Sequence, residues 1–154
     1  MKLKISHLVP AGRDRVFAAL VDPDVLRRAI PGCESLTPVG PDSYQAMLNI
    51  GVAGLKGTYT GKAAIRDQRP PEALTLSFEG KGGPGFVRGS AVIALTPEAD
   101  ATRVTSDADV QVGGLIAAVG SRLTEAAAKK LADDFFRQLA EQLSAAGDAP
   151  DRAR

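Results

Sequence analysis

Hydrophobic and polar residues alternate over the first nine residues, and this alternation predicts a β-strand over residues 2–9. A short helix is expected over residues 11–20, where Val16, Phe17 and Leu20 form an apolar stripe. The chain therefore begins with a strand that leads directly into a helix.

A second short helix is predicted to begin at Asp22-Pro23, because aspartate is a favourable N-cap and proline suits the first helical position. Val25, Leu26 and Ile30 supply its buried side, and Pro31-Gly32 ends it.

Six further strands are predicted between Cys33 and Val112, where short alternating segments are separated by glycine, proline and aspartate. Segments punctuated in this way form successive antiparallel hairpins. The strands are expected near residues 33–39, 43–52, 55–67, 73–81, 86–96 and 102–112.

A long amphipathic helix is predicted from about Leu115 to Ala145, directly after Gly113-Gly114. Its apolar residues recur at four-residue steps: Leu115, Val119, Leu123, Ala127, Leu131, Phe135, Leu139 and Leu143. Residues 146–154 are expected to form a disordered tail, which leaves one domain over residues 1–145.

The predicted order is one strand, two short helices, six strands and one long helix. A curved antiparallel sheet must bury one face, and only the long helix is able to cover it. The sequence therefore predicts an α+β fold of the helix-grip type. Its curved antiparallel sheet, of about seven strands, wraps around the long C-terminal helix, and two short helices follow the first strand.

Small residues are frequent on the more apolar face of the predicted sheet. Protein interiors are densely packed, so small residues on neighbouring strands leave either close contact with the helix or a cavity. We predict a cavity, since one lined by apolar groups would be dry and would suit an apolar ligand. The alternative is that the glycines only allow the sheet to bend. The small residues are Gly57, Gly61, Ala63, Gly80, Gly89, Ala91, Ser106 and Ala108.

The candidate ligand-binding residues come from the sheet, the short helices and the start of the long helix. They are Phe17, Ile30, Leu48, Ile50, Tyr59, Gly61, Phe78, Phe86, Ala91, Ser106, Ala108, Val110, Leu115, Val119 and Leu123. Tyr59, Lys81 or Ser106 are candidates to orient a polar head group. The segment 80–85 is predicted to be a flexible hairpin tip, with a gate beside the cavity mouth as the alternative.

Composition narrows the classes of function. The chain has 154 residues, of which 44% are hydrophobic and 24% charged, as in an ordinary soluble domain. The net charge of +1 and the aromatic content of 5% argue against a nucleic-acid partner.

The start of the chain lacks the apolar core of a signal peptide, and no apolar run approaches the ~20 residues that span a bilayer. We therefore expect a cytoplasmic protein without an integral membrane segment. Leu115, Ile116 and Val119 leave a peripheral membrane contact open, although we expect them to pack in the core.

Candidate chemistry is sparse, because the chain has one histidine and one cysteine. We expect His7 to be a structural residue that makes one hydrogen bond, with a general base as the alternative. A single cysteine, Cys33, excludes an intrachain disulfide, and nothing in the sequence pairs it with His7 as a nucleophile. We expect no catalytic residue, no metal site and no cofactor.

Two segments resemble the carbon monoxide dehydrogenase G-subunit family, within the START-like (SRPBCC) superfamily. These are residues 22–34, which read DPDVLRRAIPGCE, and residues 110–117, which read VQVGGLIA. The resemblance covers about residues 1–143 and implies a START-like helix-grip fold with an internal cavity. It also implies association with a molybdenum-hydroxylase system such as carbon monoxide dehydrogenase, as an accessory subunit.

We therefore expect a non-enzymatic binding protein that holds a hydrophobic small molecule, such as a lipid or a quinone-like electron acceptor, and presents it to a molybdenum-containing oxidoreductase. The redox partner rests on the resemblance alone. One alternative is a START-like cyclase or hydratase, which would need titratable groups in the cavity; the inner face offers His7, Ser106 and Tyr59. The other is a ligand-free assembly factor with a collapsed core.

Overall fold

The fold is given by a computed structural model, which describes the backbone of residues 1–153 and the side chains of residues 1–144. The strands are β1 (Lys2–Val9), β2 (Cys33–Gly40), β3 (Ser43–Ile50), β4 (Gly57–Arg69), β5 (Ala73–Gly82), β6 (Gly85–Glu98) and β7 (Ala101–Gly114). The helices are α1 (Arg13–Leu20), α2 (Pro23–Ala29), α3 (Leu115–Ala118) and α4 (Ser121–Ala153). The tail predicted over residues 146–154 lies outside the residues whose side chains are described, so its disorder stays a prediction.

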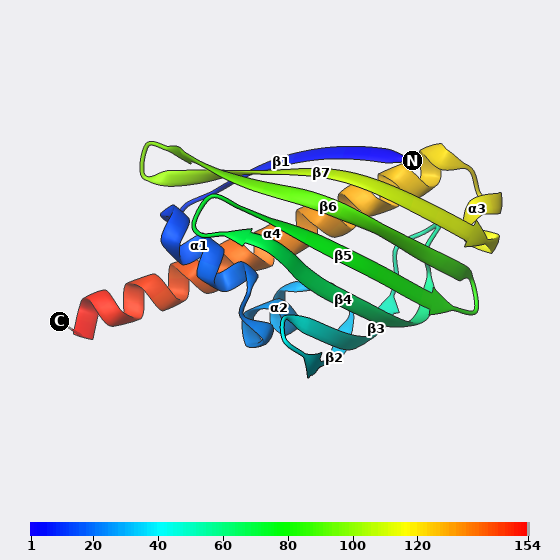
Figure 1. Cartoon of the computed structure of the whole chain (residues 1–154), viewed down its shortest axis with the longest axis horizontal. Coiled ribbons are helices and arrows are strands. Elements are labelled where there is room, and N and C mark those ends of the chain that lie inside the picture. The colour runs from blue at the N-terminus through cyan, green and yellow to red at the C-terminus, as the bar shows by residue number, and fades with distance from the viewer. Residues whose placement is uncertain (154) are drawn as a thin grey trace.

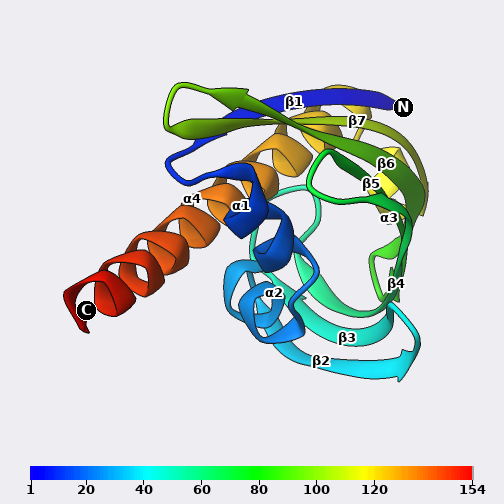
Figure 2. The ribbon, with the colours of Figure 1, turned by 60° about the vertical axis from the view of Figure 1, so that its left-hand side comes forward.

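The seven strands form one antiparallel sheet in the order β1-β7-β6-β5-β4-β3-β2. The first strand pairs with the last, which makes β1 and β2 the two edges. The sheet curves around α4, which crosses its concave face (Figures 1 and 2), and α2 packs against both α4 and β2. This arrangement confirms the predicted α+β helix-grip fold.

The link from β1 to the short helices is fixed by two polar contacts, of which the sequence predicted the Asp22 cap. The buried hydroxyl of Thr102 donates to the backbone oxygen of Ala11 at 2.7 Å and ties the end of β1 to β7. Asp22 caps α2, since its side chain accepts a hydrogen bond from the backbone N–H of Asp24 at 2.9 Å. Pro23 occupies the first turn, as predicted.

The long helix predicted from Leu115 is in fact two helices. α3 ends at Ala118 and α4 begins at Ser121, because Gly120 adopts a φ of +95°, a conformation that glycine reaches without steric cost. The hydroxyl of Thr124 donates to the backbone oxygen of Gly120 at 3.0 Å and stabilises the start of α4.

The break changes which side chains around it are buried. Leu115 is 68% exposed and Val119 is 44% exposed, so the prediction that they pack in the core is wrong. Ile116, between them, is 1% exposed, and its prediction is confirmed.

Two buried clusters lie at opposite ends of the concave face. The larger one joins α1, the sheet and the later turns of α4, and includes Phe17, Val104 and Leu139. The smaller one joins the β3–β4 connection, α3 and the early turns of α4, and includes Leu55 and Ile116. Side chains of both clusters border the cavity described below.

Candidate functional site

A cavity of about 470 Å³ lies between the concave face of the sheet and α4. Its volume falls in the range of small-molecule sites. Residues of all seven strands line it. The helix α4 closes it with Thr124, Ala128, Leu131, Ala132, Phe135 and Phe136.

The cross-strand register explains why this space is open. Gly80 pairs with Gly61, and Gly61 pairs with Ala46, so three neighbouring strands present nothing larger than a methyl group to the interior. Ala91 and Ala108 pair in the same way on β6 and β7. The concave face of the sheet therefore carries small side chains at positions where a densely packed core would have large ones.

The inner-face glycines serve two different purposes. A Cβ atom on Gly80 would meet no atom within 4 Å, so this glycine leaves open space. A Cβ atom on Gly89 would lie 3.0 Å from Cα of Val110 and closer still to the neighbouring backbone, so Gly89 permits the close approach of β6 and β7. Gly80 thus fits the cavity interpretation and Gly89 a close approach of two strands, while the sheet bending proposed for the glycines stays a prediction.

Ten of the fifteen predicted ligand-binding residues line the cavity. They are Ile30, Leu48, Ile50, Tyr59, Gly61, Phe78, Ala91, Ser106, Ala108 and Val110.

The other five predicted residues do not line the cavity, and the prediction was wrong there. Phe17 is buried in the core cluster around α1. Phe86 has the opposite strand parity to the inward-facing Val87, and its ring lies 5.4 Å from the Arg88 guanidinium carbon. The remaining three lie around the break at Gly120 and are exposed: Leu115, Val119 and Leu123.

Sequence reasoning missed Tyr44, Ala128 and Ala132, which all line the cavity. Tyr44 shares the strand parity of Leu48, so the alternation already carried the signal. The two alanines lie one position beyond the predicted helical stripe at Ala127 and Leu131.

Two of the hydroxyl groups in the cavity wall are already engaged by the protein. The Tyr59 hydroxyl donates to the backbone oxygen of Leu55 at 2.6 Å, and burial raises the pKa of Tyr59. Thr124 donates to the backbone of its own helix start. Neither side chain keeps its proton free for a ligand.

Two other hydroxyl groups remain available. They belong to Tyr44 and Ser106, which both line the cavity. Lys81, the third predicted head-group residue, is exposed and lies outside the cavity lining. Lys62 and Glu79 border the cavity from strand positions whose side chains point to the outer face.

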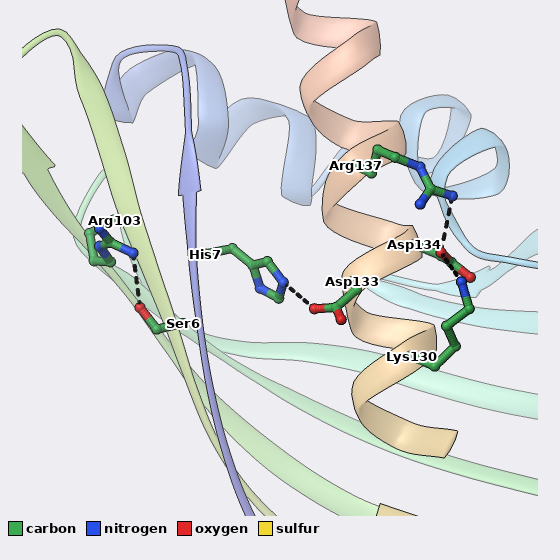
Figure 3. A network of polar contacts seen from close by, with 7 residues as sticks. All are labelled: Ser6, His7, Arg103, Lys130, Asp133, Asp134 and Arg137. Carbon is green, nitrogen blue, oxygen red and sulfur yellow. Dashed lines mark hydrogen bonds and ion pairs between the residues drawn. The ribbon is translucent and has the colours of Figure 1, made fainter. Parts of the chain in front are cut away.

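His7 joins β1 to α4 rather than facing the cavity. Figure 3 shows its ring pointing from β1 towards Asp133, whose Oδ1 lies 2.6 Å from Nε2. The ring also stacks on Phe136 with the centroids 4.6 Å apart, and Nδ1 is enclosed without a partner among the described residues. His7 makes one hydrogen bond, as the sequence predicted, and it is not among the residues that line the cavity.

Cys33 lies at the opposite edge of the sheet, in β2, and forms no pair with His7. Its thiol donates to the backbone oxygen of Ser35 at 3.3 Å, and burial raises the pKa of the Cys33 thiol. Within the part of the chain that the structure describes, no three histidine, cysteine, aspartate or glutamate side chains come together.

Charged side chains of α4 pair with one another instead of entering the cavity. Lys130 and Arg137 each lie 3.0 Å from Asp134, as Figure 3 shows. The hydrogen bond from Lys130 is the main reason that the pKa of Asp134 lies below its usual value.

Residues 6–144 match the model of the carbon monoxide dehydrogenase G-subunit (CoxG) family. The chain belongs to this family. The match confirms the resemblance found in the sequence and places the chain in a family associated with carbon monoxide dehydrogenase. None of the curated proteins compared with the chain matches it.

The solved structures of three proteins resemble this chain. A conserved protein from Geobacillus kaustophilus is 36% identical, with a TM-score of 0.90 over 94% of this chain and 95% of its own. A protein from Thermus thermophilus is 17% identical, with a TM-score of 0.70 over 95% of this chain and 99% of its own. A protein from Chromobacterium violaceum is 14% identical, with a TM-score of 0.67 over 91% of this chain and 95% of its own. The last two share the fold.

This CoxG-family chain thus has a cavity whose inward-pointing side chains are uncharged and mostly hydrocarbon. Such a wall can surround an apolar molecule and offer it two hydroxyl donors. Among the described residues, no helix is long and apolar enough to cross a membrane.

Proposed function

We propose that this CoxG-family protein holds an uncharged hydrophobic molecule in its cavity and presents it to a molybdenum hydroxylase of the carbon monoxide dehydrogenase type. The observation that carries the proposal is the 470 Å³ apolar cavity. Protein interiors normally pack to the density of organic crystals, so an unfilled volume of this size has a purpose other than stability. The enzyme partner follows from membership of the family.

We expect the ligand to be uncharged, because the side chains that point into the cavity carry no charge and the Met1 ammonium at its border donates to the backbone oxygen of Val110. A buried carboxylate without a partner costs several kcal/mol, whereas a carbonyl oxygen needs only a hydroxyl donor. Ser106 and Tyr44 supply such donors from β7 and β3. A quinone-like electron acceptor has this character: a flat apolar ring with carbonyl oxygens at its edge.

The contacts around the cavity favour a carrier over a catalyst. His7 is not among the residues that line the cavity, and the Tyr59 hydroxyl is held by Leu55. An open volume also argues against an assembly factor with a collapsed core.

A binding titration with a quinone tests the ligand. Isothermal titration calorimetry would compare a short-tailed benzoquinone with decanoate, which is similarly apolar but charged. We expect the quinone to bind and decanoate to bind at least tenfold more weakly, because its charge is unpaired in the cavity. Ala108→Leu, which fills the cavity, should weaken quinone binding, while Ala64→Leu, on the outer face, should not. Equal binding by both variants would contradict a cavity site.

A separate assay tests the enzyme partner. Purified carbon monoxide dehydrogenase would be given carbon monoxide and the same quinone, either free or bound to this protein, and quinone reduction would be followed by absorbance. We expect faster reduction when the quinone is bound. Equal or slower reduction would count against presentation to this enzyme, and would leave the ligand result standing.

A further inference from the structure

We propose that α2 is a gate over the cavity, which swings away from α4 to let the ligand in and out. A hydrogen bond from the side chain of Gln142 to the backbone of Val25 holds the gate shut. The proposal rests on the ligand holding proposed above. It adds the route by which the molecule reaches the cavity and the residue that controls the rate of its passage.

The position of α2 makes it part of the cavity wall. At one edge of the sheet, β1 packs directly against α4, and His7 and Asp133 join the two at 2.6 Å. At the other edge, α2 lies between α4 and β2, as Figure 2 shows. Leu26 of α2 and Ile30, which caps the helix, both line the cavity. A displacement of α2 would therefore open the cavity to solvent on this side.

The helix α2 is held less firmly than its neighbour α1. The guanidinium of Arg15 in α1 donates to the backbone oxygen of Leu143 in α4. Half of the eight residues of α1 are buried: Val16, Phe17, Ala19 and Leu20. In α2, only Ala29 is buried among seven residues. Segments with few buried side chains open at a small part of the free energy of global unfolding, so α2 can move while α1 stays in place.

The apolar side chains of α2 face open volume rather than packed side chains. Leu26 and Ile30 line the cavity, and neither belongs to the two buried clusters. Both are partly exposed in the closed arrangement, and so is Val25, which packs against the edge of the larger cluster. Moving α2 therefore exposes little apolar surface that is now buried, which keeps the cost of opening small.

Both ends of the α2 segment are fixed to the rest of the fold. Leu20, at the end of α1, is buried in the larger cluster. After α2, the backbone N–H of Asn49 in β3 donates to the oxygen of Gly32 at 2.8 Å. Gly32 has a φ of +72°, which glycine reaches without steric cost, and a Cβ atom there would collide with the backbone oxygen of Asn49. The moving part is thus residues 21–31, with its backbone hinges at the two ends of the helix.

The Gln142 side chain controls how easily the gate opens. Its Nε2 donates to the backbone oxygen of Val25 at 3.1 Å. Its Oε1 is enclosed and has no hydrogen-bond partner within the described part of the chain. An enclosed amide oxygen that has lost its bond to water raises the free energy of the closed state, and opening returns that bond. The closed state is therefore favoured by the bond from Nε2 and disfavoured by the enclosed oxygen.

Hydrogen exchange of the full chain tests whether α2 opens separately from α1. The N–H groups of Leu26 and Val16 make the first backbone hydrogen bond of α2 and α1, and we expect Leu26 to exchange faster after correction for intrinsic rates. Gln142→Glu, at mildly alkaline pH, keeps the size of the side chain and removes its donor. It should speed exchange at Leu26 about fivefold, the contribution of one hydrogen bond. The matched control is Gln138→Glu, one turn earlier on α4, which should leave that exchange unchanged.

Stopped-flow fluorescence tests whether the gate controls entry. The probe is N-phenyl-1-naphthylamine, an uncharged molecule whose fluorescence rises in apolar surroundings. Gln142→Glu should raise its association and dissociation rates about fivefold each and leave Kd unchanged, because the ligand passes the same gate in both directions. Gln138→Glu should behave like the parent chain.

The outcomes separate the gate from the ligand site. Exchange at Leu26 no faster than at Val16 would overturn the gate. A Kd changed through the dissociation rate alone would also overturn it and would assign Gln142 a contact with the ligand. Probe binding with rates that Gln142→Glu leaves unchanged would overturn the gate and leave the ligand site standing. No probe binding at all would overturn the proposed function and the gate with it.

Discussion

Replacing Ala108 with leucine is expected to raise the free energy of unfolding. Ala108 lies on the inner face of β7 between Leu3 of β1 and Ala91 of β6, and it lines the cavity. Leucine adds three carbon atoms, which gain at most about 2.4 kcal/mol at ~0.8 kcal/mol per buried methylene. Ordering the longer side chain costs about 0.5–1 kcal/mol, so the net gain is about 1.5 kcal/mol.

Thermal unfolding measures this gain. For a chain of this size, about 1.5 kcal/mol raises Tm by roughly 3–6 °C. Ala64→Leu is the matched control, because Ala64 lies on β4 away from the cavity and an outer-face substitution changes stability by about 0.5 kcal/mol or less.

The sign of the change decides whether the cavity exists in solution. If the sheet and α4 closed onto each other, the added carbons would overpack the core and lower stability by about 1–3 kcal/mol. A fall in Tm for Ala108→Leu with an unchanged control would refute the cavity. A stabilised variant that no longer binds the ligand would show that the space is kept open at a cost in stability.

Three further predictions concern contacts outside the cavity. His7→Ala should lower the free energy of unfolding, measured by urea denaturation, by about 1–3 kcal/mol, because the hydrogen bond to Asp133 and the stacking on Phe136 are both lost. His7→Phe should recover part of this loss, because it restores the stacking on Phe136. Equal losses for the two variants would contradict this account. Iodoacetamide should alkylate Cys33 more slowly than it alkylates glutathione at mildly alkaline pH, because burial raises the pKa of the thiol; an equal rate would contradict it. Asp134→Asn should lower the free energy of unfolding at neutral pH, because the ionised carboxylate of Asp134 stabilises the folded chain only above its lowered pKa. The difference in unfolding free energy between the variant and the parent should therefore vanish as pH falls through that pKa. A difference that persists in acid would contradict this reasoning.

Much of the sheet follows from the sequence because a strand has a strict two-residue period. Alternation placed Leu48, Gly61 and Ala108 on the inner face, and the structure has them there. Breaks at glycine and proline located the strand ends to within a few residues, as at the strand predicted over residues 43–52 and observed at Ser43–Ile50.

The start of the long helix was harder to predict. A four-residue apolar row continues from Leu115 through Val119 to Leu123 without a change in composition. Only Gly120 signals the break, and a single glycine within a helical pattern is often tolerated. The exposed residues Leu115, Val119 and Leu123 were therefore predicted to be part of the buried stripe.

Contacts between distant residues could not be predicted from one sequence. His7 and Asp133 are 126 positions apart, and their pairing depends on how α4 crosses β1. The hydrogen bond from Tyr59 to Leu55 likewise occupies the hydroxyl of a candidate head-group residue, and the alternation of residues along a strand does not predict this bond. The volume of the cavity depends on the register of five strands and on the distance of α4 from them.

Native mass spectrometry of the full chain, paired with organic extraction, tests the central claim most directly. The protein would be purified from its own cells, and the extract would be analysed for small molecules. We predict a reproducible adduct of an uncharged apolar molecule that Ala108→Leu loses and Ala64→Leu retains. A clean mass for the unliganded chain, unchanged after incubation with quinones and neutral lipids, would contradict the proposed carrier function.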